Sequence, residues 1–160
     1  MKKILFLSIL LLSAFSIQAQ KGLKINTVFE TYGMKEGSIL VELSKDVLSN
    51  NTKISYYKSL VMPESLVREN DCMEAINIDL KGGAKLMESQ KNGKVETGYY
   101  TLKHDKKNNT YEYILYKNKS KKLTLVYLKG NFPPQKLENE LDKLKDLFIY
   151  VNKKRIKLAN

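Results

Sequence analysis

The chain has 160 residues, 42% of them hydrophobic and 28% charged, with 28 basic against 17 acidic side chains and a net charge of +11. Cys72 is the only cysteine, which excludes a fold stapled by internal disulfides, so a buried core must hold the chain together. The charge would attract nucleic acid, anionic lipid or polyanionic glycans, although lysines scattered along a chain are also typical of a solvated surface.

The first 20 residues have the layout of a secretory signal peptide. Two lysines precede an apolar run from Ile4 to Leu12, and small and polar residues follow. The run is too short for an ordinary membrane span, so we expect cleavage near Ala19 or Gln20. Residues 21–160 would then form a single domain with a net charge of +9. Because no cysteine ends the signal and no later apolar run is long enough to span a bilayer, we expect a periplasmic or secreted protein without a transmembrane span.

The first half of the expected domain alternates between helical and extended patterns. Apolar residues at helical spacing predict a helix from about Leu23 to Tyr32, which Gly33 ends. The alternating segment 38–44, SILVELS, predicts a buried strand. Ser44 is suited to cap a short helix through Lys45 to Ser49.

Two further elements follow before the middle of the chain. The run from Ile54 to Met62 favours a strand around Tyr57 to Val61, although a helical start is also compatible with it. From Ser65 to Leu80 the apolar residues recur at helical spacing, and Gly82-Gly83 ends that helix. Asn92-Gly93 is a hairpin signal that joins a strand near Lys85 to Ser89 to the next strand.

Three consecutive strands are predicted at Val95 to Leu102, Tyr111 to Tyr116 and Leu123 to Lys129. The polar gaps between them are too short for parallel crossovers, so an antiparallel meander is expected. In the third strand both faces carry apolar residues, which suggests that both are covered. In the middle strand either Tyr111, Tyr113 and Leu115 or Ile114 and Tyr116 would fit as the inner set.

The C-terminal part contains one more helix pattern. Pro133 and Pro134 precede a leucine stripe that predicts a helix from Gln135 to Phe148. The last residues, IYVNKKRIKL, would add a short strand or hairpin, or would fray. Altogether the pattern predicts one α+β domain, with an antiparallel β-sheet meander and helices packed mainly on one face.

Candidate chemistry is sparse. His104, the only histidine, lies at a predicted turn beside Asp105, and the metal-binding motifs of zinc and calcium sites are missing from the sequence. Cys72 is expected to be a small buried residue. Glu88 and Glu96 would face each other across the predicted hairpin, although surface carboxylates at this spacing are common. We therefore predict no cofactor, no metal site and no catalytic residues.

Short segments of the chain resemble a group of small exported Bacteroidetes proteins that are classed only as domains of unknown function, especially the family numbered 4252. The resemblance rests on Phe29-Glu30-Thr31-Tyr32, on the strand from Gly37 to Ser44, on the segment around Leu86 and Met87, and on LTLVYLKGNF from Leu123 to Phe132. It implies no activity and no catalytic residues. Many exported relatives carry a lipid-modified cysteine that this chain lacks, and this departure from the family points to a free periplasmic or secreted protein.

The function classes follow from these patterns. The leading hypothesis is a non-enzymatic binding or interaction module of the cell envelope, whose partner would be another envelope protein or an anionic surface. The second is a protein that binds polyanions or membrane surfaces through the basic cluster Lys153, Lys154, Arg155 and Lys157. The third is a small hydrolase of unknown substrate that uses His104. No specific nucleic acid is expected as a partner.

Overall fold

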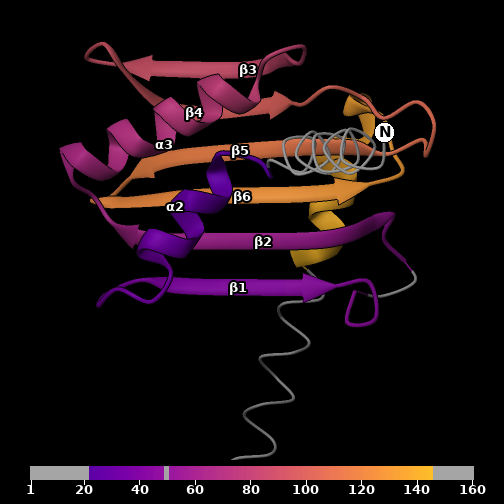
Figure 1. Cartoon of the computed structure of the whole chain (residues 1–160), viewed down its shortest axis with the longest axis horizontal. Coiled ribbons are helices and arrows are strands. Elements are labelled where there is room, and N and C mark those ends of the chain that lie inside the picture. The colour runs from indigo at the N-terminus through magenta and orange to yellow at the C-terminus, as the bar shows by residue number, and fades with distance from the viewer. Residues whose placement is uncertain (1–21, 49–50, 146–160) are drawn as a thin grey trace, which may run out of the picture.

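The computed structural model of the protein describes residues 22–48 and 51–145. Its described strands form one antiparallel sheet of six strands in the order β1-β2-β6-β5-β4-β3 (Figure 1). The strands are β1 (Ile39–Ser44), β2 (Ile54–Pro63), β3 (Ala84–Lys91), β4 (Lys94–Thr101), β5 (Tyr111–Lys119) and β6 (Lys122–Gly130). The sheet is open, and with its helices it confirms the predicted α+β class and the meander of β4, β5 and β6.

The hairpin from β3 to β4 forms where the sequence signal lies. Asn92 and Gly93 have φ angles of 53° and 75°. Two successive positive φ angles produce the turn whose twist matches that of antiparallel strands, and Asn-Gly is the dipeptide that adopts it most easily. The turn therefore fixes the register that places Lys91 opposite Lys94.

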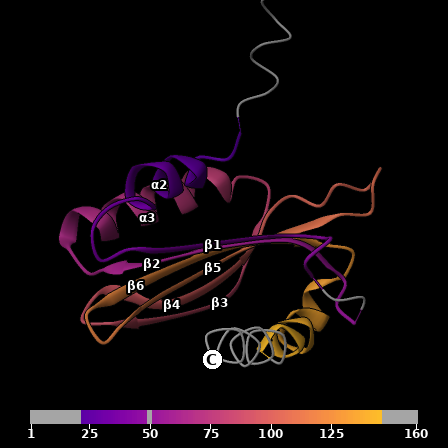
Figure 2. The ribbon, with the colours of Figure 1, turned by 90° about the horizontal axis from the view of Figure 1, so that it is seen from below.

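Two helices, α2 (Ile25–Tyr32) and α3 (Leu66–Asp79), cover one face of the sheet (Figure 2). Both were predicted, and Ser65 caps α3 by accepting a hydrogen bond from the Arg68 backbone nitrogen. Asp79 at the end of α3 accepts hydrogen bonds from the backbone nitrogens of Lys24 and Ile25, so it satisfies donors at the start of α2. The core on this face contains Ile25, Phe29, Leu60, Met62, Cys72, Ile76, Tyr100, Ile114, Tyr116, Leu123 and Leu125 among its buried residues.

The 3-10 helix η1 (Pro134–Lys136) and the helical residues 137–145 lie against the opposite face. Leu137 and Leu144 are buried there with Tyr113, Val126 and Leu128. We expected this helix on the same face as α3, and the structure differs because β5 and β6 are apolar on both sides. Both candidate inner sets of β5 are accordingly covered, one on each face: Tyr113 and Leu115 are buried on one face, with Tyr111 half-buried beside them, and Ile114 and Tyr116 are buried on the other.

Two N-terminal predictions were wrong in detail. The strand at 39–44 exists, but it is not buried: Ile39 is 62% exposed and Leu40 is 36% exposed, because β1 has only β2 as a neighbour in the described sheet. The short helix expected from Lys45 is a turn over residues 45–47, closed by hydrogen bonds from the Val47 and Leu48 nitrogens to the Ser44 oxygen. A single turn of helix has too few internal bonds to form without support from tertiary packing.

Some predictions concern residues outside those described. These are the signal peptide, the C-terminal end of the Gln135 to Phe148 helix, the strand or hairpin at 149–158, and the basic cluster Lys153, Lys154, Arg155 and Lys157.

Candidate functional site

A groove opens at the end of the sheet where the β3–β4 and β5–β6 hairpin turns lie, at the left in Figure 1. Pairing between β4 and β5 stops at Thr97 opposite Lys117. The first residues of β4 and the last residues of β5 separate beyond that point and leave a depression of about 470 Å³. Residues of both turns line it, together with Glu64. We call this depression the hairpin groove.

Lysine pairs flank both turns of the hairpin groove. Lys91 lies directly opposite Lys94 in the β3–β4 pairing, and Lys119 lies directly opposite Lys122 in the β5–β6 pairing. Like charges in directly opposed positions destabilise an antiparallel pair by about 0.2 to 1 kcal/mol. The same arrangement of opposed lysines therefore occurs twice at one end of the sheet.

The β5–β6 turn is also unfavourable in its backbone. Ser120 and Lys121 have φ angles of 57° and 60°. This is the same left-handed pair of conformations as in the other hairpin, but neither residue is Gly or Asn, and each therefore costs roughly 1 kcal/mol. Locally unfavourable choices of this kind concentrate at binding and switch regions, where selection for function outweighs local stability.

A buried carboxylate anchors one wall of the hairpin groove. Glu69 on α3 is 6% exposed, and its Oε2 lies 3.0 Å from the Lys94 Nζ. The Asn118 Nδ2 donates to Glu69 Oε1 at 3.2 Å and to Glu64 Oε1 at 3.1 Å. The Glu64 backbone nitrogen donates to the Lys121 oxygen at 3.0 Å. These contacts tie the start of α3 to both hairpins.

The electrostatics of Glu69 follow from those contacts. Burial alone would raise the pKa of its carboxyl, but the hydrogen bonds with Lys94 and Asn118 outweigh burial and hold the pKa below its usual value. Glu69 is therefore ionised at neutral pH and compensates the charge of Lys94. Lys91, Lys119 and Lys121 form no ion pair with any described residue and are exposed. Glu64 and Glu96 are the acidic residues that line the groove. The lining lysines outnumber them, so the groove carries a net positive charge.

A second depression, of about 450 Å³, lies at the other end of the strands, beside Lys53, Thr110 and Asn131. Its nearest polar groups are already engaged, because Thr52 Oγ1 and the Lys53 backbone nitrogen both donate to the carboxylate of Glu140, at 3.0 and 2.8 Å. Glu140 is 1% exposed and also pairs with Lys143 at 2.8 Å. These bonds attach the helical residues 137–145 to the start of β2, which is a structural role.

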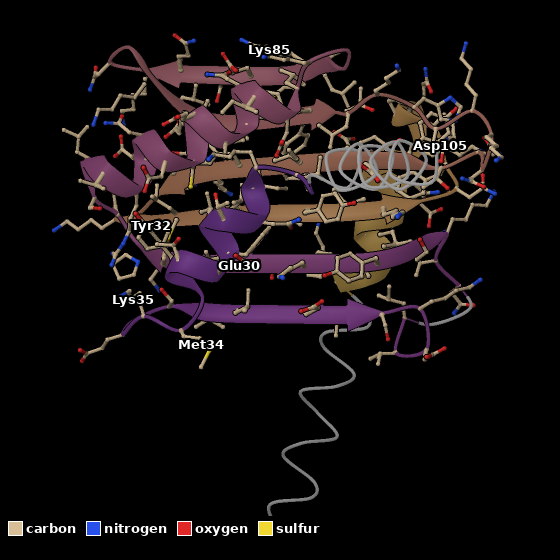
Figure 3. The ribbon with its side chains drawn as sticks, viewed as in Figure 1. Glu30, Tyr32, Met34, Lys35, Lys85 and Asp105 are labelled. Atoms are coloured by element: carbon tan, nitrogen blue, oxygen red, sulfur yellow. The ribbon has the colours of Figure 1, made fainter. Side chains whose placement is uncertain are left out.

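The candidate catalytic groups from the sequence lie apart. The ring of His104 stacks on Tyr111 with centroids 3.9 Å apart. Asp105 lies at the end of the sheet opposite the hairpin groove (Figure 3), and its carboxylate accepts hydrogen bonds from the backbone nitrogens of Lys107 and Asn108 in its own turn. Glu88 lies opposite Gly98, so Glu88 and Glu96 do not form the pair that we considered. Burial raises the pKa of the Cys72 thiol to about 12, which makes it a poor nucleophile at neutral pH.

No group of three or more His, Cys, Asp or Glu side chains is arranged to hold a metal ion in residues 22–48 and 51–145. Over the same residues, none of the helices has the length and apolar character needed to cross a bilayer.

Sequence reasoning missed the hairpin groove, although a signal was present. The segments 91–94, KNGK, and 119–122, KSKK, both place lysines on either side of a two-residue turn. They are far apart in the chain, and only the strand order brings the two turns together. Our sequence-based site, the cluster Lys153, Lys154, Arg155 and Lys157, lies outside the described residues.

Comparison with known proteins gives a family but no activity. A family model described as "Family of unknown function (DUF6108)" matches residues 12–141. No curated protein matches the chain. The match includes both hairpins of the groove and all six described strands. It agrees with the resemblance to domains of unknown function, but the matching family is not the one numbered 4252.

Proposed function

This chain belongs to the DUF6108 family of unknown function, and we propose that it is a non-enzymatic binding protein that holds an anionic polymer in the hairpin groove. The polymer would carry phosphate or sulfate groups, which exposed lysines bind as point charges. The observation that supports the proposal most strongly is the pair of opposed lysines at each of the two turns, Lys91 with Lys94 and Lys119 with Lys122. A bound anion would relieve the repulsion between Lys119 and Lys122 and would balance the charge of Lys91, whereas Glu69 already compensates Lys94.

The backbone of the groove supports the same proposal. The left-handed conformations of Ser120 and Lys121 place two exposed residues at the tip of a turn whose own local energy is unfavourable. The contacts of Glu69 with Lys94 and Asn118 hold two lining residues of the groove in place. A pre-arranged wall reduces the ordering cost of binding, because fewer side chains must be immobilised when the ligand arrives.

We propose further that the protein acts in the cell envelope or outside the cell, after cleavage near Ala19 or Gln20. The layout of the first 20 residues supports export, as does the resemblance to exported Bacteroidetes proteins, including the family numbered 4252. Mass spectrometry of the protein recovered from its host tests this proposal. An N-terminus at or next to residue 20 or 21 would support it, and an intact Met1 would contradict it.

Retention of residues 21–160 on a heparin column tests the binding proposal, with the salt concentration at elution as the measurement. The groove variant carries Lys91→Ala, Lys119→Ala and Lys121→Ala. The control variant carries Lys35→Ala, Lys81→Ala and Lys107→Ala, which removes the same charge from exposed positions elsewhere. A third variant carries Lys153→Ala, Lys154→Ala and Arg155→Ala.

We expect the groove variant to elute at the lowest salt concentration of the three. Equal shifts in all three variants would mean that net charge alone drives retention, which would contradict a defined site. A larger shift for the third variant would instead place the site at the C-terminal cluster.

A further inference from the structure

The strand β1 forms an edge of the described sheet that is less protected against pairing with another chain than the opposite edge, β3. It pairs with β2 over six consecutive residues without a register shift, and no described strand lies on its other side. Half of its backbone N–H and C=O groups therefore point away from the sheet, where another strand is able to bind them.

Exposed apolar side chains gather along this edge. Ile39 is 62% exposed and Leu40 36%, while Met34 before the strand and Val47 after it are 92% and 54% exposed. Figure 3 shows Met34 beside the start of β1, at the end of α2. An extended strand with apolar neighbours at both ends offers both hydrogen bonds and hydrophobic contact to a partner.

The opposite edge, β3, is protected. Its pairing with β4 contains two register shifts, between Lys85 and Met87 and between Ser89 and Gln90. It also carries Lys85, Glu88 and Lys91. Bulges and charged residues are the usual means by which an edge strand is kept from adding another strand.

The charge along each edge indicates which one accepts a second copy of this basic chain. Positions 34–47 contain two basic and three acidic residues, whereas positions 81–94 contain four basic residues and one acidic residue. Two copies brought together at β3 would therefore repel each other more strongly than two copies brought together at β1.

We propose that two copies of the chain associate through antiparallel pairing of their β1 strands, about a twofold axis normal to the sheet. With such an axis, the same face of the sheet continues from one copy into the other. Odd-numbered residues of β1 therefore lie opposite odd-numbered residues of the partner, and even-numbered residues lie opposite even-numbered ones. The register centred on Val41 places Ile39 opposite the partner's Leu43, and Leu40 opposite the partner's Glu42. A register centred on Glu42 would oppose two carboxylates and is disfavoured.

This association goes beyond the proposed anion binding and does not depend on it. The hairpin groove lies between the β3–β4 and β5–β6 turns, and β2 and β6 separate β5 from β1 in the strand order. Pairing at β1 therefore leaves the groove of each copy accessible.

Sedimentation velocity of residues 21–160, from about 1 to 200 µM, tests the proposal. We expect the wild-type chain to shift from monomer to dimer over this range. Ile39→Lys should raise the dissociation constant at least about tenfold, because it removes apolar contact and places a charge beside the pairing strand. Met87→Lys, at a comparably apolar and exposed position on β3, should leave the constant unchanged. Ile39→Thr, a strand-compatible polar change, should weaken association in the same direction.

A monomer at every concentration would overturn the proposal. So would equal weakening by Met87→Lys, or the absence of an effect from both Ile39 variants. Thermal unfolding of each variant shows whether the fold is kept, and the heparin experiment on the same variants separates this proposal from the proposed function.

Discussion

Lys119 lies directly opposite Lys122 across the β5–β6 pairing, next to a turn of two residues with positive φ. A neighbouring hairpin repeats the arrangement with Lys91 and Lys94. Lys91, Lys119 and Lys122 are exposed and form no ion pair with any described residue, whereas Lys94 pairs with the buried Glu69. This repetition is the observation that supports the proposed anion site at this end of the sheet.

Replacing Lys119 with Glu should affect stability and binding in opposite directions. The change turns a repulsive cross-strand pair into an attractive one, and we expect the free energy of unfolding to rise by about 0.5 to 1 kcal/mol. It also removes a cation from the hairpin groove, so elution from heparin should occur at lower salt. Urea unfolding and heparin retention of the same preparation measure the two effects.

Lys129→Glu is the matched control for that experiment. Lys129 pairs with Glu112 across the same two strands, with 3.9 Å between Nζ and Oε1. The change creates a repulsive pair and should lower stability by about 0.2 to 1 kcal/mol, with a smaller effect on heparin retention than Lys119→Glu. If Lys129→Glu lowered heparin retention as much as Lys119→Glu does, the result would contradict the groove as the site of anion binding.

Replacing Ser120-Lys121 with Asn-Gly should stabilise the protein. Asn and Gly adopt positive φ at much lower cost than Ser and Lys, and we expect a gain of about 1 to 2 kcal/mol. The midpoint of thermal unfolding measures it. An unchanged or lower midpoint would show that the left-handed turn is not a source of strain.

Replacing Glu69 with Gln should weaken the fold but strengthen anion binding. The change removes the partner charge of Lys94, and the loss of charged hydrogen bonds should cost about 1 to 3 kcal/mol. Because Lys94 then becomes an uncompensated cation in the groove, elution from heparin should require more salt. Glu140→Gln is the control, since it removes a buried carboxylate far from the groove; its elution should change less.

Acid should destabilise the protein through three carboxylates. Burial alone would raise the pKa values of Glu69, Glu88 and Glu140, but hydrogen bonds from lysines and neighbouring donors outweigh it and lower all three. A lowered folded-state pKa adds stability above the unfolded value, about 4.3 for Glu, and this stability is lost as the pH falls through the folded value. Urea midpoints should therefore be nearly constant from pH 7 to about pH 5 and fall below about pH 4. A variant with Gln at all three positions should show a smaller fall.

The sequence predicted the individual helices and strands better than it predicted which other parts of the chain each of them contacts. Tyr111 to Tyr116 and Leu123 to Lys129 were identified as strands because tyrosine and branched residues between short polar gaps favour extended structure. The β3–β4 turn was predictable from Asn92-Gly93 alone. Local chemistry determines these features, so a sequence is sufficient to reveal them.

Features that depend on the order of the strands in the sheet could not be predicted from local sequence. The apolar alternation of residues 39–44 is compatible with a central or an edge position, and only the pairing of β2 with β6 makes β1 an edge. Glu140 stood among polar positions of a helix pattern, yet its contacts with Thr52 and Lys53 bury it. The hairpin groove likewise requires two distant turns to meet.

The most direct test of anion binding is an NMR titration of uniformly ¹⁵N-labelled residues 21–160 with a short sulfated oligosaccharide, followed through the backbone amide shifts. We predict that the largest saturable shifts occur at residues 91–97 and 117–122, and that Lys119→Glu reduces them. Saturable shifts confined to other parts of the chain, or the absence of saturable shifts, would contradict the assignment of the hairpin groove as the binding site.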